Sequence, residues 1–464
     1  MRASNFAWVF ASALLAGCAT YRPLPLDNAR RQEKLADITV SATSMPVPAL
    51  RTHRFDPADG LDVTEVAMLA VANNPDLRSQ RDDEAISHAQ AFAAGLLPDP
   101  QVSYEHDRPD PHQSENTPAF NLGLTWNLGD LLTRSARVAS AKADTRQVHL
   151  KLLWNEWQTI AQARTLFDKL SSTRSLVARL QAEHAALAPI RQYVERALKA
   201  GDLTYDSASA GLNAASDVDN KLADAQRQLD QTEHDLHALL GLDDALPLHL
   251  VGAPCTIEAD AAQVAQAVQA MPERRPDLLA LQAGYESQQQ KLRAAILAQF
   301  PAIAVGLTRA RDTGNIHTSG FSVGLSLPLF DGNRGNIAIE RATRQKLRDE
   351  YEARVLSDRN DVALLWKQVQ AFEAQRPALR AHAEQLAKAR DAAQRAFANG
   401  LLDWPTYLAI RASSLSADTD LLSSQQNADA QAIALDALVG AWPDGSLAGN
   451  DQEPWSANER QARK

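Results

Sequence analysis

Two groups of histidine and carboxylate residues are the first candidates for chemistry, because these side chains are common metal ligands. The first group has helical spacing and consists of Glu233, His234 and His237. The second group lies in a polar loop and consists of Glu105, His106, Asp107, Asp110 and His112. A selective metal site needs three or four ligands in fixed positions, and a solvated helix face and a polar loop explain both groups without a metal. We therefore predict no metal site and no cofactor.

No motif in the sequence predicts catalysis. The sequence contains neither a nucleotide-binding loop nor an HExxH zinc motif. The four methionines stand far apart, at positions 1, 45, 68 and 271, and do not support a thioether relay for copper. Cys255 follows Pro254 and is interpreted as a small buried hydrophobic residue rather than a nucleophile. We therefore predict that the protein is not an enzyme.

Composition limits the partners. The 464 residues carry a net charge of −10, with 45% hydrophobic and 22% charged residues. The acidic balance argues against a nucleic-acid partner, because neutralising phosphates requires clustered Lys and Arg. The chain has no uninterrupted apolar run of the roughly 18 residues that a membrane-spanning helix needs. Any contact with a membrane must therefore come by another route.

The N-terminus predicts export and a lipid anchor. Arg2 is followed by an apolar segment at 6–16 that has the length of a signal-peptide core. The next residues, Leu15-Ala16-Gly17-Cys18, resemble the lipobox of bacterial lipoproteins. That resemblance implies a signal peptide at 1–17 and lipidation of Cys18, and Ala19 after the cysteine resembles the outer-membrane address. A plain signal peptide with an incidental cysteine is the alternative.

The rest of the chain is a duplication with an offset of about 200 residues. The matched pairs are residues 73–77 with 274–278, 97–98 with 300–301, 120–130 with 321–331, 200–203 with 399–402 and 240–241 with 439–440. The first unit is predicted to cover 57–250 and the second 251–442. A proline-containing extended linker at 18–56 precedes them, and a polar tail at 443–464 follows.

Each unit is predicted to fold as two helices, two strands and two more helices. The helices of the first unit are expected at 61–73, 75–97, 131–200 and 204–241. Those of the second are expected at 261–272, 276–299, 334–399 and 405–440. Apolar residues in the long helix recur at three-four spacing from Leu153 to Val194, which is typical of a coiled-coil seam. At about 1.5 Å per residue, two shorter helices placed end to end match the long one, which predicts a helical wall about 100 Å long.

Four strands with period-two alternation lie between the helices. The strongest two carry apolar side chains on one face, which we expect to contact lipid: Phe120, Leu122, Leu124, Trp126 and Leu128 in one, and Phe321, Val323, Leu325 and Leu327 in the other. Glycine and small polar residues on the other face suit a wet lumen. Each strand has about 9 residues, the length of one tilted crossing of a bilayer. Because the smallest barrels have about eight strands, several chains must each contribute four.

These features together resemble the TolC-type outer membrane factors, over about residues 57–442. The resemblance rests on the lipobox, the duplicated unit, the NPDL and RPDL helix starts at 74–77 and 275–278, and the glycines at the distal turns. It implies a mainly α, α+β fold: a trimer with one twelve-stranded outer-membrane barrel continued by a twelve-helix periplasmic tunnel. It also implies docking onto a periplasmic adaptor and an inner-membrane pump, expected to be of the proton-driven resistance-nodulation-division type. The heavy-metal (CzcC-like) and drug-efflux branches both remain open.

The distal turns are the expected gate. Members of the family close the tunnel at its periplasmic tip, often with rings of Asp just past the turn glycines. In this chain Gly201 is followed by Asp202 and Asp206, and Gly400 by Asp403. A threefold ring of carboxylates would attract cations. Thr406 and Ala409 occupy the usual acidic positions farther along, so Asp403 is a substitute, and the alternative is that these Asp residues only cap helices.

The predicted function is thus a passive outer-membrane export duct for small molecules or metal ions. Two alternatives remain, a lipid-anchored periplasmic coiled-coil scaffold without a pore and the duct of a type I protein secretion system. Heat-resistant trimers and membrane conductance distinguish the pore from the scaffold.

Overall fold

The computed structural model describes residues 21–26, 35, 38–109, 117–252 and 260–439. The chain divides into two compact units, Met1–Ile38 and Thr39–Lys464. Residues 21–26 of the first unit have no regular secondary structure. The predicted signal peptide, Cys18, Cys255 and the polar tail all lie outside the described residues, as do Asp110 and His112.

Residues 39–56 belong to the second unit and are not simply extended. A short 3-10 helix, η2 (Ala42–Ser44), and one helical turn, α2 (Pro48–Arg51), lie here. Met45, Val47 and Leu50 are buried, and the Nε of Arg51 donates to the carbonyl of Met45 at 2.8 Å. The prolines prevent a long helix, but closely spaced apolar side chains still fold this segment onto other residues. The expectation of an extended linker reaching residue 56 is therefore wrong for this part.

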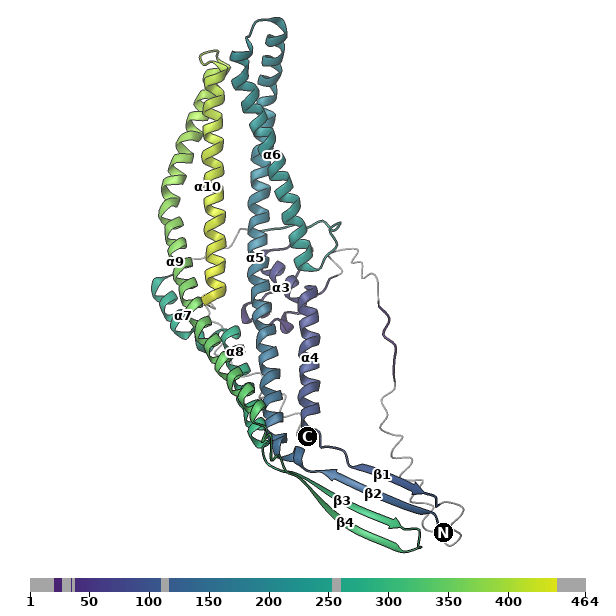
Figure 1. Cartoon of the computed structure of the whole chain (residues 1–464). Coiled ribbons are helices and arrows are strands. Elements are labelled where there is room, and N and C mark those ends of the chain that lie inside the picture. The colour runs from purple at the N-terminus through teal and green to yellow at the C-terminus, as the bar shows by residue number, and fades with distance from the viewer. Residues whose placement is uncertain (1–20, 27–34, 36–37, 110–116, 253–259, 440–464) are drawn as a thin grey trace. The chain divides into compact units, whose positions relative to one another are not determined.

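The remaining elements occur in two sets with the same order (Figure 1). The first set is α3 (Val63–Asn73), α4 (Pro75–Gly95), β1 (Gln101–Asp107), β2 (Ala119–Asn127), α5 (Gly129–Ala200) and α6 (Tyr205–Leu240). The second set is α7 (Ala261–Arg274), α8 (Pro276–Leu297), β3 (Ala302–Arg311), β4 (His317–Ser326), α9 (Arg334–Ala398) and α10 (Trp404–Val439). The element order thus follows the duplication found in the sequence.

Local chemistry explains where these helices begin and end. Asp62 and Glu65 form a capping box at the start of α3, and Asn74 caps α4 by accepting from the N–H of Leu77 at 3.0 Å. Proline is the first residue of both α4 and α8, where its missing N–H costs nothing. The long helices end at Gly201 (φ 81°) and next to Gly400 (φ 70°), left-handed conformations that favour glycine.

Two short helices do run beside one long helix. The 72 residues of α5 span about 108 Å, and α5 packs against both α4 and α6. The end of α6 meets the start of α4, where the side-chain amides of Asn73 and Asn74 donate to the carbonyls of Leu240 (2.7 Å) and Leu239 (2.9 Å). These bonds satisfy carbonyls that a helix end leaves unpaired, and they fix the end-to-end arrangement. In the second set, α8 and α10 both pack against α9.

The four strands form one antiparallel sheet in the order β1-β2-β3-β4. β2 ends at Asn127 and β4 at Ser326. Leu128 and Leu327, both expected within strands, therefore lie one residue beyond them. The N–H of Leu128 still donates to the carbonyl of Ile303 at 2.7 Å, but its own backbone has already turned toward the helix (ψ −8°). In the described part of the chain, no helix has the length and apolarity to span a membrane.

Candidate functional site

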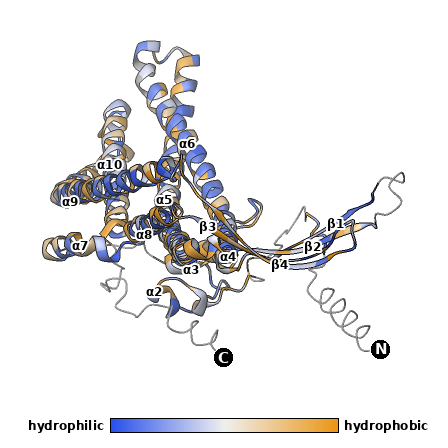
Figure 2. Ribbon diagram, turned by 60° about the horizontal axis from the view of Figure 1, so that its bottom comes forward, coloured by the Kyte–Doolittle hydropathy of each residue, from blue (hydrophilic) through white to orange (hydrophobic). Residues whose placement is uncertain are grey.

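The register of the sheet puts its apolar side chains on one face. Directly paired residues of antiparallel strands point to the same side, so the pairings define rows across the sheet. One row contains Val102, Leu124, Leu307 and Phe321, and the next contains Trp126, Val305 and Val323. Ile303 and Leu325 form a third row. Figure 2 shows the four strands side by side, with hydrophobic and hydrophilic residues along them, and the register joins both predicted apolar sets into one surface.

This apolar face is open to solvent in the single chain. Phe321 is 69% exposed, Leu307 57% and Val323 56%. Trp126 lies at the end near the helices, where its indole N–H donates to the carbonyl of Pro98 at 2.8 Å. Tyr104 and Phe120 lie toward the other end. Exposure of large apolar side chains on one face, with aromatic residues at both ends, is typical of a lipid-facing sheet.

The opposite face is polar and has little side-chain volume. Its rows include Ser103, Gly123, Thr308 and Gly320, and also Thr125, Gly306 and Ser322. At Gly306 an added Cβ would lie 2.4 Å from the Oγ of Ser322, and at Gly123 it would lie 2.5 Å from the Oγ of Ser103. Glycine therefore lets the hydroxyl groups of neighbouring strands occupy this face.

The predicted gate residues lie at the two distal turns. Asp202, Asp206 and Asp403 are all exposed. The carboxylate of Asp403 accepts from the N–H of Thr406 at 3.1 Å, which is the cap that sequence reasoning offered as the alternative to a gate. A carboxylate can cap a helix and still present its charge to solvent, so the two roles are compatible.

A charged link between the two helical hairpins, α5–α6 and α9–α10, was not predicted. Arg411 of α10 donates to both carboxylate oxygens of Glu183 on α5, at 2.8 and 2.6 Å, and to the hydroxyl of Tyr407 at 2.7 Å. The ring of Tyr407 stacks on Phe397 with centroids 4.6 Å apart. Bidentate arginine–carboxylate pairs are geometrically specific, so this link fixes the hairpins against each other near the tip.

A packing contact reinforces this link. Trp404, the first residue of α10, lies so close to Gly211 of α6 that a Cβ there would be 2.5 Å from the indole ring. Buried apolar residues of both hairpins surround the contact, including Val194, Ala208, Ala393 and Leu408. The tips of the two hairpins are therefore held together by an apolar cluster as well as by an ion pair.

Between α5 and α10, farther from the turns, the chain buries several charges. Arg164 approaches Asp436 at 3.6 Å, and both residues are buried. Asp168 is 4% exposed, and its Oδ1 has no hydrogen-bond partner among the described residues. Burial and the like charge of Asp429 raise the pKa of Asp168 to about 7, and burial, opposed by Arg164, raises the pKa of Asp436 to about 6. This contact therefore depends on protonation.

A second buried network joins the two sets of elements. Arg275, 1% exposed, contacts the carboxylates of Asp277 (2.6 Å) and Asp358 (3.1 Å). Its guanidinium also lies 4.8 Å from the ring centroid of Trp154 on α5, a cation–π distance. Burial raises the pKa of Asp358, although Arg275 and Arg354 oppose this shift. In the internal duplication Arg275 corresponds to Asn74, and each residue precedes the proline that begins a helix.

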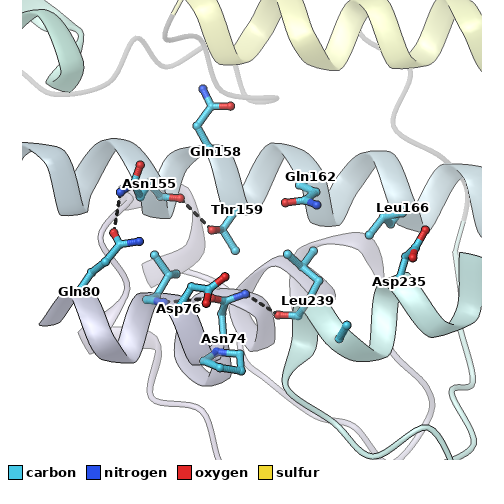
Figure 3. Close-up of a pocket in the computed structure, with 13 residues that line it drawn as sticks. Asn74, Asp76, Gln80, Asn155, Gln158, Thr159, Gln162, Leu166, Asp235 and Leu239 are labelled. Atoms are coloured by element: carbon cyan, nitrogen blue, oxygen red, sulfur yellow. Dashed lines mark hydrogen bonds between the residues drawn. The ribbon is translucent and has the colours of Figure 1, made fainter. Parts of the chain in front are cut away.

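The joint between α4 and α6 borders a cavity of about 600 Å³ that is lined by both polar and apolar residues (Figure 3). Gln80 and Asn155 are hydrogen bonded across it at 2.6 Å, and Thr159 donates to the carbonyl of Asn155. The amide of Asn74 that holds the end of α6 lies at its edge. The cavity thus marks a junction of three helices with amide-rich walls.

The described members of the two histidine groups do not converge. His234 contacts Asp244 at 2.8 Å, whereas the ring nitrogens of His237 lie 2.7 Å from the carbonyls of Glu233 and Leu246. In the strands, His106 stacks on Tyr104, and Glu105 lies on the opposite face because it neighbours His106 in the strand. A third cluster, His53, Asp62 and Glu65, is occupied by the capping box of α3.

Comparison with known proteins gives the following similarities. Residues 267–441 match the family model described as "Outer membrane efflux protein". The multidrug resistance outer membrane protein MdtP of Shigella flexneri is 26% identical, over 84% of this chain and 86% of that protein. The cobalt-zinc-cadmium resistance protein CzcC of Cupriavidus metallidurans is 24% identical, over 68% and 74%. The CmeC outer membrane channel of Campylobacter jejuni shares the fold, with a TM-score of 0.70 over 96% of this chain and 98% of that one, at 13% identity.

Proposed function

We infer that this chain, which belongs to the TolC-type outer membrane factor family, is the outer membrane channel of a tripartite efflux system. We propose a trimer with a twelve-stranded barrel and a helical tunnel, through which an inner-membrane pump exports small molecules or metal ions. A periplasmic adaptor would connect the two, and the pump would be of the proton-driven resistance-nodulation-division type. Lipidation at Cys18 would add an anchor to the outer membrane.

The four-stranded sheet is the observation that carries the proposal. One face is apolar and exposed, the other is small and polar, and β1 and β4 have one paired edge each in the sheet. A sheet in a bilayer must satisfy all its backbone groups by closing on itself. Four strands are too few to close, whereas three copies supply twelve.

Internal symmetry supports how the copies would join. Within the chain, the first set contacts the second through β2 with β3 and through α5 with α8. If the second set of one copy meets the first set of the next copy in the same way, β4 lies beside β1 of the next copy and α9 lies beside its α4. Both helices carry exposed apolar side chains for such a contact: Ile339 and Leu356 on α9, and Ile86 and Phe92 on α4.

The tips would act as the gate. Asp202, Asp206 and Asp403 are exposed at the turns that follow Gly201 and Gly400, so a threefold arrangement would repeat their charges around one axis. A ring of like carboxylates attracts cations and raises the cost of bringing the tips together. The Glu183–Arg411 pair would hold the hairpins in the closed arrangement.

The strand register gives a direct test of closure. The pair Val102–Leu124 in the first hairpin corresponds to the pair Ile303–Leu325 in the second, with each residue shifted by 201 positions (303 − 102 and 325 − 124). Between the hairpins, Leu124 pairs with Leu307, and the same shift relates Leu124 to Leu325 and His106 to Leu307. The corresponding contact between copies joins Leu325 to His106 of the next copy. A Leu325→Cys/His106→Cys variant treated with a short bis-thiol reagent should give covalent trimers, whereas Leu325→Cys/Ser103→Cys, with side chains on opposite faces, should not. Monomers alone from the first variant would contradict the proposed ring.

Conductance tests the pore. In planar bilayers the wild type should form channels that are blocked by multivalent cations, and Asp206→Ala/Asp403→Ala should lose that block. Asp230→Ala, which removes an exposed carboxylate away from the turns, serves as the matched control. A lipid-anchored scaffold predicts no channels at all. The duct of a type I secretion system would instead conduct but restore export of a polypeptide, not drug or metal resistance, in a cell that lacks its own channel.

A further inference from the structure

The far end of the apolar sheet face carries positive charge. The last two rows on this face contain Tyr104, Leu122, Arg309 and Ser319, and then His106, Phe120, Arg311 and His317. We call Arg309 and Arg311 the cationic belt, and His106 and His317 lie in the same row as Arg311. At about 3.4 Å per residue, the eight steps from Ile303 to Arg311 span roughly 27 Å along the strand, which at a tilt of about 40° rises roughly 21 Å, most of the roughly 25 Å apolar band of outer-membrane barrels. The belt therefore follows the apolar rows at the hairpin end of the sheet.

Charges of opposite sign lie on opposite faces of the four strands. The paired residues on the apolar face include no carboxylate. Glu105 and Asp107, the acidic residues of β1, have the opposite side-chain direction because they alternate with Tyr104 and His106. An acidic chain of net charge −10 thus gathers cations where the apolar face ends.

Arg311 is held in place but keeps free donors. Its Nε and Nη2 donate to the carbonyl of Pro118 at 3.1 and 2.7 Å, and its guanidinium lies 5.5 Å from the ring centroid of Phe120. A guanidinium has five N–H donors. The remaining N–H donors of Arg311 can bind an acceptor beyond the apolar rows. The guanidinium of the exposed Arg309, one row away, offers a second set of donors.

We propose that the cationic belt binds the phosphate groups of lipids in the outer leaflet of the membrane. This proposal rests on the proposed function, which places the apolar face in lipid and the hairpin turns outside. Arginine binds phosphate with a planar fork, long cationic side chains reach from an apolar surface to the head groups, and basic residues attract anionic lipids. The phosphate-bearing lipid would then hold neighbouring strands together at the outer rim.

The test measures lipid retained by the purified trimer. The full chain is reconstituted in phosphatidylcholine vesicles containing lipid A, or lipid A from which the phosphates have been removed, and native mass spectrometry measures lipid bound after extraction. Each arginine near an anionic surface changes binding by roughly fivefold, so Arg309→Gln/Arg311→Gln should bind phosphorylated lipid A roughly thirtyfold more weakly. Arg309→Lys/Arg311→Lys should retain part of the preference. Arg341→Gln, an exposed site on α9, should behave as the wild type.

Two outcomes would overturn the proposal. In the first, the wild type retains phosphorylated and dephosphorylated lipid A equally. In the second, Arg309→Gln/Arg311→Gln forms trimers and channels and keeps the full preference for phosphate. A wild type that inserts into none of these vesicles would instead contradict the proposed pore itself, and the belt proposal would fall with it.

Discussion

The buried Asp168 makes the contact between α5 and α10 sensitive to pH. Its pKa is raised from 3.8 to about 7 by burial and by Asp429. The charged groups facing this contact are Arg164 on the same helix, Asp429 and Asp436 on α10, and Glu373 and Arg376 on α9, which act on Asp429. Arg164 is already engaged with Asp436. Asp168 therefore keeps its proton in the folded chain where the unfolded chain has lost it.

The sign and size follow from this difference. Below about pH 4 both states are protonated and the stability is fully present. As the pH rises to about 7, the unfolded state releases the proton first, so the free energy of unfolding falls. At about 1.4 kcal/mol per pKa unit, Asp168 alone accounts for a loss of up to about 4 kcal/mol. Asp436, with a pKa of about 6, contributes in the same direction, and its smaller loss levels off above about pH 6. Because Asp436 and His234, whose pKa is raised by Asp244, also change protonation near neutral pH, the difference between the wild type and a variant without the Asp168 carboxyl isolates Asp168.

The substitution Asp168→Asn removes the ionisation and keeps the shape. Urea midpoints followed by circular dichroism in detergent should fall between about pH 4 and pH 7 for both proteins, but by clearly less for Asp168→Asn than for the wild type. Asp230→Asn, at an exposed position, should follow the wild type. An equal fall in Asp168→Asn and the wild type over this interval would refute the assignment of the titration to Asp168.

Three further changes test other contacts. Arg275→Met should lower the free energy of unfolding by about 3–5 kcal/mol, because it leaves buried carboxylates without a cation; the urea midpoint measures this. Gly211→Ala should destabilise the chain, although alanine is better than glycine in a helix by about 1 kcal/mol, because its Cβ would displace the ring of Trp404; a rise in the midpoint would contradict that packing. Glu183→Gln should raise the resting conductance in planar bilayers by weakening the link between hairpins, and unchanged conductance would show that this ion pair does not hold the tips closed.

The sequence predicted those features that depend on local chemistry. Prolines at 75 and 276 and glycines at 201 and 400 mark helix starts and ends because they act on their own backbone. Period-two alternation predicted strand faces, since the side-chain direction alternates whatever the strand pairs with. The errors at Leu128 and Leu327 lie at strand ends, where alternation continues after pairing has stopped.

Contacts between distant segments could not be predicted in this way. Glu183 and Arg411 are far apart in the chain, and each has an unremarkable position on a polar helix face when read alone. Nothing in the local sequence explains a glycine at position 211 within a helix, and the ring of Trp404 accounts for its small size. Asp168 follows Phe167, a buried residue of the apolar seam of α5. A carboxylate next to a seam position was the signal in the sequence that could have indicated a buried charge at Asp168.

The two sets of elements have diverged at equivalent positions, and their surroundings explain how. Asn74 precedes Pro75 and uses a neutral amide to hold the end of α6, whereas Arg275 precedes Pro276 and reaches Trp154 and two carboxylates. Arg275 faces α5, because α8 packs against that helix. It therefore joins the first set of elements to the second, whereas Asn74 joins the end of α6 to the start of α4 within the first set. A cation paired with Asp358 of α9 and stacked on α5 connects both long helices at one point. If three copies form a ring, the first set meets its neighbour at Asn74 without such a cation. The contact within the chain would then carry a buried ion pair that the contact between chains lacks at this position.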